Sequence, residues 1–194
     1  MPGDDVDRWR HVNGHAAPHM RVMRAGDVER VAEVERESFS PAWPATAFER
    51  ELRQNATARY IVLETEDGGE ILGFAGLWLM VDEAHVVTVA VDPRFRGRGY
   101  GRLLVHGLVE VAREHQMAVA TLECRVSNVA ARTLYQRYGF YEVGMRRRYY
   151  SDNREDAVIM TTEDLRSEPF ERRLAVLSEE LRTLIPGVEP VVAS

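Results

Sequence analysis

The residues with the clearest chemical potential form a glycine-rich turn, Arg96-Gly97-Arg98-Gly99-Tyr100-Gly101. An apolar run typical of a strand, Val86–Val91, precedes the turn, and a helical pattern with an apolar stripe follows it. Glycines let the backbone approach a ligand closely, and the free N–H groups of a first helical turn point toward that ligand. The segment therefore predicts a site at which main-chain N–H groups hold a phosphate-bearing molecule.

This turn matches neither of the two common phosphate-binding loops. The dinucleotide fingerprint requires Gly-x-Gly-x-x-Gly, and here the third glycine comes one position too early. A P-loop ends in Gly-Lys followed by Ser or Thr, and the turn has no such ending. Its pattern is Arg-x-x-Gly-x-Gly. The alternative is a turn with solvated arginines, but the flanking strand, the Asp92-Pro93 turn and the helical stripe favour the ligand.

The elements that must position this turn are a mixture of helices and strands. Periodicity and turn residues predict, in chain order, helices near 27–39 and 45–54 and strands near 59–64, 70–78 and 84–91. They then predict a helix over 99–115, a strand over 118–124, a helix from 128 to 138, and a hairpin of 140–150 with 157–160. This order indicates an α/β sandwich, because it lacks the regular alternation of a doubly wound fold.

Composition limits what the chain can be. Its 194 residues suit one domain or two small ones, and a hydrophobic content of 45% is enough for a core. A net charge of −6 does not favour nucleic acid as a partner, although arginines are dense at 94–102 and 146–148. The single Cys124 excludes an internal disulfide framework. No apolar run approaches the roughly 20 residues of a membrane span, so we expect a cytoplasmic protein without membrane attachment.

The first nineteen positions are polar and contain His11, His15 and His19. On a helix this spacing would place three imidazoles on one face as metal ligands. The intervening Gly14 and Pro18 argue against a helix. We therefore predict a disordered leader over 1–19 and no metal site.

Several segments resemble motifs of the GNAT acyltransferase superfamily, in the order that superfamily has them. They are Val89-Ala90-Val91-Asp92-Pro93, the Arg-x-x-Gly-x-Gly turn, and the run from Ser127-Asn128 through Leu134-Tyr135 to Gly139-Phe140. The runs 122–128, 146–150 and 154–160, and the Pro-Trp loop at 41–44, are similar to the ribosomal-protein-alanine N-acetyltransferases of the RimI type. The resemblance covers roughly 21–162, so we expect a catalytic domain over 20–162. Residues 163–194 would form a C-terminal extension with an amphipathic helix over 171–184.

The resemblance implies a GNAT fold, in which a mixed, mostly antiparallel sheet of about six to seven strands has helices on both faces and a splayed central strand pair. It implies acetyl-CoA as co-substrate and no metal. Backbone groups of Val89, Ala90 and Val91 would contact the pantetheine arm, and Asn128 would bind the same arm while capping its helix. The pyrophosphate would be held by Gly97, Arg98, Gly99, Tyr100, Gly101 and Arg102. For the two arginines, exposure to solvent is the alternative.

Acetyl transfer to an amine needs one group that removes a proton and another that protonates the departing thiolate. The resemblance assigns the first role to Glu123, which strand alternation turns away from Cys124. Glu83 is a rival base and His85 a weaker one. The resemblance makes Tyr135 the general acid, and a core aromatic is its alternative. Cys124 is not expected to be a nucleophile, because transfer in this superfamily is direct.

The acceptor site is implied by four aromatic residues. Tyr149 and Tyr150 would close over the acceptor, with Phe39 and Trp43 on the opposite wall, although either residue of that wall could belong to the core. The predicted activity is acetylation of the N-terminal amine of a ribosomal protein that begins with alanine. The alternatives are a lysine or small-molecule amine acetyltransferase and a non-catalytic acetyl-CoA-binding module. The sequence leaves the oligomeric state open.

Overall fold

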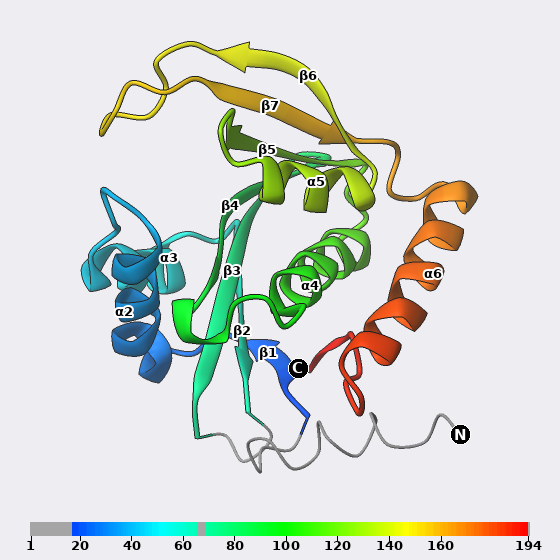
Figure 1. Ribbon diagram of the computed structural model, residues 1–194, viewed down its shortest axis with the longest axis horizontal. Helices are drawn as coiled ribbons and strands as arrows, with labels where there is room; N and C mark the ends of the chain where they lie inside the picture. The colour runs from blue at the N-terminus through cyan, green and yellow to red at the C-terminus, as the bar shows by residue number, and fades with distance from the viewer. Residues whose placement is uncertain (1–16, 66–68, 194) are drawn as a thin grey trace.

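An open sheet in the strand order β6-β7-β5-β4-β3-β2-β1-β8 forms the centre of this computed structural model (Figure 1). The structure describes residues 17–65 and 69–193. The strands are β1 His19–Val22, β2 Ala58–Glu64, β3 Ile71–Met80, β4 Glu83–Val91, β5 Val119–Arg125, β6 Phe140–Arg146, β7 Ala157–Thr162 and β8 Val192–Ala193. Neighbouring strands run antiparallel except in the pairs β4–β5 and β1–β8.

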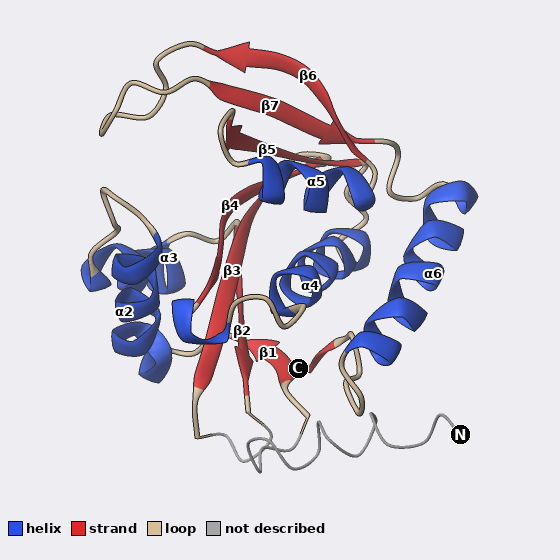
Figure 2. Ribbon diagram, in the orientation of Figure 1, coloured by secondary structure: helices blue, strands red, loops and turns tan. Residues whose placement is uncertain are grey.

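Helices cover both faces of the sheet (Figure 2). Helices α2 (Val28–Ser38) and α3 (Ala45–Gln54) lie on one face. Helices α4 (Tyr100–Glu114), α5 (Val129–Arg137) and α6 (Glu168–Leu184) lie on the other, and short 3₁₀ turns at Ala25–Asp27 and Pro93–Phe95 precede α2 and α4. The mixed, mostly antiparallel architecture with two helical layers confirms the predicted fold class.

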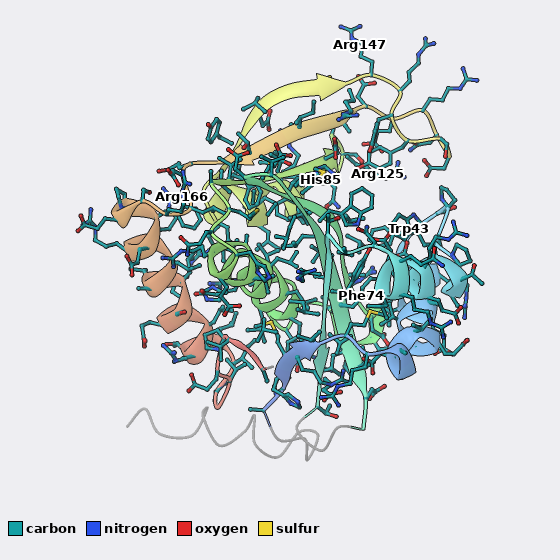
Figure 3. All side chains as sticks on the ribbon, turned by 180° about the vertical axis from the view of Figure 1, so that it is seen from behind. Trp43, Phe74, His85, Arg125, Arg147 and Arg166 are labelled. Carbon is teal, nitrogen blue, oxygen red and sulfur yellow. The ribbon has the colours of Figure 1, made fainter. Side chains whose placement is uncertain are left out.

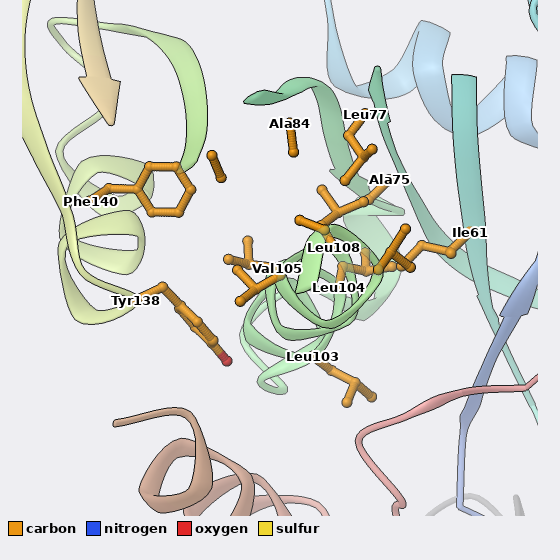
Figure 4. Packing of buried hydrophobic residues seen from close by; sticks show 14 of the residues in the cluster. Ile61, Ala75, Leu77, Ala84, Leu103, Leu104, Val105, Leu108, Tyr138 and Phe140 are labelled. Atoms are coloured by element: carbon orange, nitrogen blue, oxygen red, sulfur yellow. The ribbon is translucent and has the colours of Figure 1, made fainter. Parts of the chain in front are cut away.

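Helix α4 builds the larger of the two hydrophobic cores. Its apolar residues recur at helical spacing, so Leu104 and Leu108 are buried against the sheet (Figure 4). Tyr138 and Phe140 close the same core from the α5 side, and apolar residues of α6 complete it. A second core, which includes Phe48, fills the space between the opposite face of the sheet and helices α2 and α3.

Across residues 17–65 and 69–193 the sheet has eight strands, not the six to seven predicted. The additional strands are β1 and β8, which pair with each other in parallel at the edge of the sheet. Both are too short for a period-two pattern to be visible in the sequence, and β8 follows a proline-containing tail. Position 19, predicted to be in the leader, is the first residue of β1. His11 and His15 lie outside the described residues, as does most of that predicted leader.

The C-terminal helix begins earlier than predicted. Helix α6 starts at Glu168, because the Ser167 hydroxyl accepts a hydrogen bond from the Phe170 N–H group and Pro169 occupies the first turn, where it fits. No helix within residues 17–65 and 69–193 has the length and apolarity needed to cross a bilayer.

Candidate active site

A gap opens in the centre of the sheet between two parallel strands. Strand β4 pairs with β5 only over Glu83–His85 and Val119–Thr121. Beyond His85 the strands diverge, and β5, β6 and β7 turn away from β4 (Figure 1). On its other edge β4 carries a bulge at Val87, which has no partner on β3. The diverging strands leave the β5-facing edge of β4 without strand partners, which confirms the predicted splayed pair.

The predicted cofactor residues of β4 lie along this open edge. Val89 and Val91 are half-buried and pack toward α4, whereas the Ala90 side chain is buried in the core beneath α2 and α3. Only the backbone of Ala90 can therefore face the gap. The carbonyl oxygen of Val91 accepts a hydrogen bond from Arg96 Nε at 3.0 Å, which ties the end of β4 to the start of the glycine-rich turn.

The glycine-rich turn leads directly into α4. Gly97 and Gly99 adopt φ values of +78° and +86°, a left-handed conformation that other residues adopt only at a cost. A Cβ atom added to Gly97 would meet nothing within 4 Å, so this side of the turn is open. Tyr100 begins α4 and packs against the larger core. A Cβ on Gly101 would be 3.7 Å from Leu134 of α5, so the turn lies beside α5.

The two predicted arginine ligands of the turn have other partners in the structure. The Arg98 guanidinium lies over the Phe95 ring, 5.4 Å from its centroid. Arg102 points toward α6, where its Nη2 atom donates to the Glu180 carboxylate at 2.7 Å. The positive charge of Arg102 is therefore directed at α6, and main-chain N–H groups remain the candidates for phosphate binding.

A row of polar side chains crosses β4 and β5 where the gap begins. The Glu123 side chain is only 8% exposed, and its Oε2 atom lies 3.3 Å from His85 Nε2. The Thr121 hydroxyl donates to Glu83 Oε1 at 2.5 Å, so it accepts from the Nδ1–H group of His85, 3.1 Å away. Arg146 on β6 contacts Glu123 Oε1 at 2.9 Å. These contacts fix the orientation of the Glu123 carboxylate.

The two candidate bases, Glu83 and Glu123, lie at different places in this row. Glu83 belongs to the closed part, where β4 and β5 are still paired, and its side chain is 38% exposed. Glu123 lies two residues beyond the last paired residue of β5, beside the gap. The sequence predicted His85 only as a rival base. The structure makes it the link between the two carboxylates, which only the register of the two strands could reveal.

Tyr135 lies on the opposite side of β5 from Glu123. It packs in the larger core with its ring centroid 5.7 Å from that of Phe140. Burial, with smaller contributions from the charges of Cys124 and Tyr150, raises the pKa of the Tyr135 phenol well above its ordinary value. Burial likewise raises the pKa of Cys124 to about 11, so both groups keep their protons near neutral pH. Neither is therefore a ready nucleophile.

Asn128 has the predicted capping role. Its Oδ1 atom accepts a hydrogen bond from the Ala131 N–H group at 3.1 Å, at the first turn of α5. The last turn of that helix ends at Gly139, which adopts a φ of +84°.

The predicted acceptor aromatics lie on two loops at one end of the molecule. Tyr149 and Tyr150 stack edge to face, with centroids 5.2 Å apart, in the loop between β6 and β7. Phe39 is 41% exposed in the loop between α2 and α3, which also holds the half-buried Trp43. Figure 3 shows Trp43 and His85 at this same end. The structure thus places both loops at the same end of the molecule.

Arg125 is a residue of this site that sequence reasoning missed. Its guanidinium lies 3.8 Å from the centroid of the Tyr150 ring and contacts Asp152 and Glu155 of the same loop. Glu155 also accepts from the Ser127 N–H group at 2.8 Å, and hydrogen bonds from the Ser127 side chain and then from its backbone lower the pKa of Glu155 to about 2. The tyrosine loop is therefore tied to the end of β5. Nothing in the sequence indicates that these distant charges meet.

Glu35 was also missed, because in the sequence it is an ordinary polar position of a helix. Its carboxylate is buried, and Oε1 accepts from the Trp43 N–H group at 3.2 Å. Within the described part of the chain, Oε2 has no hydrogen-bond partner. Burial raises the pKa of Glu35 above its ordinary value. This side chain holds the Trp43 loop against α2. In residues 17–65 and 69–193 no group of three or more His, Cys, Asp or Glu side chains is placed to hold a metal ion.

Comparison with known proteins shows which family has this sequence and architecture. The sequence model described as the acetyltransferase (GNAT) family matches residues 28–140. The N-alpha-acetyltransferase RimI of Mycobacterium tuberculosis is 39% identical, over 72% of this chain and 88% of its own. The ribosomal protein bS18-alanine N-acetyltransferase of Haemophilus influenzae is 36% identical, over 71% of this chain and 93% of its own. The crystal structure of the ribosomal-protein-S18-alanine N-acetyltransferase of Escherichia coli superimposes with a TM-score of 0.68 at 31% identity, covering 75% and 92% of the two chains.

Proposed function

Because the chain belongs to the acetyltransferase (GNAT) family, we propose that it transfers the acetyl group of acetyl-CoA to the α-amine of a ribosomal protein that begins with alanine. Two relatives, which are 39% and 36% identical to it over the aligned residues, are an N-alpha-acetyltransferase and a ribosomal protein alanine N-acetyltransferase. A ribosomal-protein substrate would place the reaction in the cytoplasm. We assign the catalytic domain to residues 20–162.

The described residues fit acetyl-CoA. The open side of Gly97 and the left-handed turn leave room for a pyrophosphate beside the first N–H groups of α4. The unpaired edge of β4, including Val89 and Val91, offers backbone groups to an amide-containing arm. Asn128 lies at the start of the neighbouring helix. When bound, the thioester supplies the acetyl group and a thiolate leaving group.

The observation that carries the proposal is the placement of Glu123 and Tyr135 on opposite sides of β5, next to the gap. In this proposal an amine reaches the gap from the side of Glu123, which takes its proton. A free α-amine has a pKa near 8, so its deprotonation costs little near neutral pH. Tyr135 holds a proton on the other side for the departing sulfur.

The partners of Glu123 support its role as base. His85 Nε2 lies 3.3 Å from Oε2, and the Thr121 hydroxyl fixes the other side of the His85 ring at Nδ1. The other oxygen contacts Arg146, whose side chain is 54% exposed. An α-ammonium group is also a cation, and it can replace this exposed guanidinium beside Oε1. Glu83, in the closed part of the row, supports Thr121 and not the acceptor.

The aromatic loops support a peptide N-terminus as acceptor. Tyr149 and Tyr150, held by Arg125, form one side, and Phe39 and Trp43 form the other. Two aromatic walls suit an extended chain end, because flat rings bury backbone and small side chains with little loss of conformational entropy.

The test compares acceptors and then variants. A peptide beginning with alanine should be acetylated at its α-amine, as read by mass spectrometry. The same peptide with a blocked N-terminus and an internal lysine, a polyamine and an aminoglycoside should remain unmodified. Acetylation of those amines would instead assign a lysine or small-molecule enzyme. Binding of acetyl-CoA without transfer to any acceptor would assign a non-catalytic module.

Variants then test the two catalytic roles. Glu123→Gln and Tyr135→Phe should each lower kcat about 100-fold or more while leaving the affinity for acetyl-CoA within a few fold. Glu83→Gln serves as the matched comparison, because a glutamine carbonyl still accepts from Thr121, and it should lower kcat only a few fold. A larger loss in Glu83→Gln than in Glu123→Gln would move the base to Glu83.

A further inference from the structure

The end of α6 packs directly on the glycine-rich turn. A Cβ atom added to Gly99 would lie 2.5 Å from Leu184 Cδ2 and 3.5 Å from Ile185 Cδ1. Leu184 is the last residue of α6 and is 46% exposed, so it covers the turn from the edge of the helix. The side of the turn at Gly97, by contrast, is open. The turn is therefore supported on one side and free on the other.

Helix α6 is itself firmly anchored. A stripe at helical spacing, which comprises Phe170, Leu174, Leu177 and Leu181, is buried in the core that α4 builds. The Ser178 hydroxyl lies 3.1 Å from His106 of α4. Beyond the helix, Ile185 and Val188 belong to the same core, and the chain ends as β8 beside β1. The end of α6 is consequently held in place by packing along the whole helix.

A charged cluster fixes the same end of the helix. Glu180 contacts Arg102, the third residue of α4, and also Arg137, the last residue of α5. Both guanidinium groups lower the pKa of Glu180, with Arg137 as the larger cause. One carboxylate on α6 thereby joins the start of α4 to the end of α5, the two helices that flank the turn.

We propose that the C-terminal segment 163–193 is a brace for the acetyl-CoA-binding turn, in which Leu184 and Glu180 are positioning residues. A turn with three glycines loses much conformational freedom when a ligand orders it, and that loss weakens binding. Packing of Leu184 on Gly99 restricts the turn before the ligand arrives. The brace therefore strengthens acetyl-CoA binding without touching the reacting atoms.

The lengths of the relatives agree with this role. The two curated relatives are covered over 88% and 93% of their own length but align with only 72% and 71% of this chain. The family match ends at residue 140, before α6 begins. The segment that contacts the turn therefore lies outside the part of the chain that matches the family model. The inference depends on the proposed position of the cofactor but not on the identity of the acceptor.

Leu184 provides a cleaner test than Glu180. Loss of the Glu180 charge would loosen the brace, which should weaken acetyl-CoA binding. It would also remove a negative charge near an anionic ligand, which should strengthen that binding. Leu184→Ala removes only apolar contact from a half-exposed position. Val176→Ala is the matched control, because Val176 lies in the same helix and is 59% exposed. Leu184→Met tests rescue by a side chain of similar size.

Acetyl-CoA binding is measured by titration calorimetry, and steady-state rates are measured with the alanine peptide. Leu184→Ala should raise the Kd and the KM for acetyl-CoA about 3- to 10-fold, with kcat unchanged within twofold. Val176→Ala and Leu184→Met should match the wild type. Equal acetyl-CoA affinity in Leu184→Ala and wild type, or a loss confined to kcat, would overturn the brace. If the wild type itself bound no acetyl-CoA, the proposed function would fail as well.

Discussion

His106 gives this fold a specific sensitivity to acid. The side chain is completely buried on α4, where Nε2 lies 3.1 Å from the Ser178 hydroxyl of α6. Among the described residues, Nδ1 has no hydrogen-bond partner. Burial, aided by the positive charge of Arg182, lowers the pKa of His106 from 6.5 to about 4. The folded protein therefore keeps this imidazole neutral at pH values where an unfolded chain would protonate it.

The sign and size of the effect follow from linkage. Between about pH 6.5 and pH 4 the unfolded state binds more protons than the folded state, so the free energy of unfolding falls as the pH falls through this window. Each unit of pKa shift is worth about 1.4 kcal/mol, so a shift of this size corresponds to a loss of roughly 3 kcal/mol by pH 4. Against a typical total of about 5–15 kcal/mol, this is a large fraction.

The assay compares urea unfolding of the wild type and His106→Gln from pH 7.5 to pH 4. Glutamine does not titrate but can still donate to the Ser178 hydroxyl. The wild type should lose about 3 kcal/mol more than the variant over this range, because all other titrating groups are common to both proteins. Glu110, whose pKa burial raises, is one such group and acts in the opposite direction. A stability difference that stays the same at pH 7 and pH 4.5 would refute the reasoning.

Three further changes test other contacts. Gly99→Ala forces a left-handed alanine against Leu184, so urea unfolding should show a loss of about 1–2 kcal/mol. Thr121→Val removes the hydroxyl that orients His85, so kcat should fall about tenfold. Thr121→Ser keeps the hydroxyl and should restore kcat. An unchanged kcat in the valine variant would show that Thr121 has no role in the site. Arg125→Met releases the loop that holds Tyr149 and Tyr150, so the KM for the peptide should rise about fivefold while the KM for acetyl-CoA stays constant. A rise in both KM values would contradict a role confined to acceptor binding.

Much of the fold was predictable because its elements carry strong local patterns. The stripe of α4, the Asn128 cap and the turn at Gly99 each depend on neighbours a few residues away, and the structure confirms all three elements. Strands β1 and β8 were missed for the opposite reason. Each is short, and each exists because a distant strand supplies hydrogen bonds, so no local pattern marks it.

The candidate site likewise has features that local sequence patterns predict and others that depend on distant strands. The side of β5 on which Glu123 lies follows from strand alternation. The structure places its carboxylate on the face opposite Cys124, as expected. The charged side chains that contact it do not follow from alternation. His85 reaches Glu123 only because β4 and β5 pair in one register, and Arg146 reaches it only because β6 and β7 fold beside β5. The catalytic roles of Glu123 and Tyr135 stay predictions until the variants are measured.

The sequence by itself determined the family, the glycine-rich turn and the types of residues that could do the chemistry, because these depend on short-range spacing and backbone conformation. The tertiary structure alone decided which charges meet. It paired Arg102, a predicted phosphate ligand, with Glu180, and it brought Leu184 onto Gly99 across more than eighty positions of chain. Such contacts depend on how whole elements pack, since burial of the α6 stripe positions every residue of that helix at once.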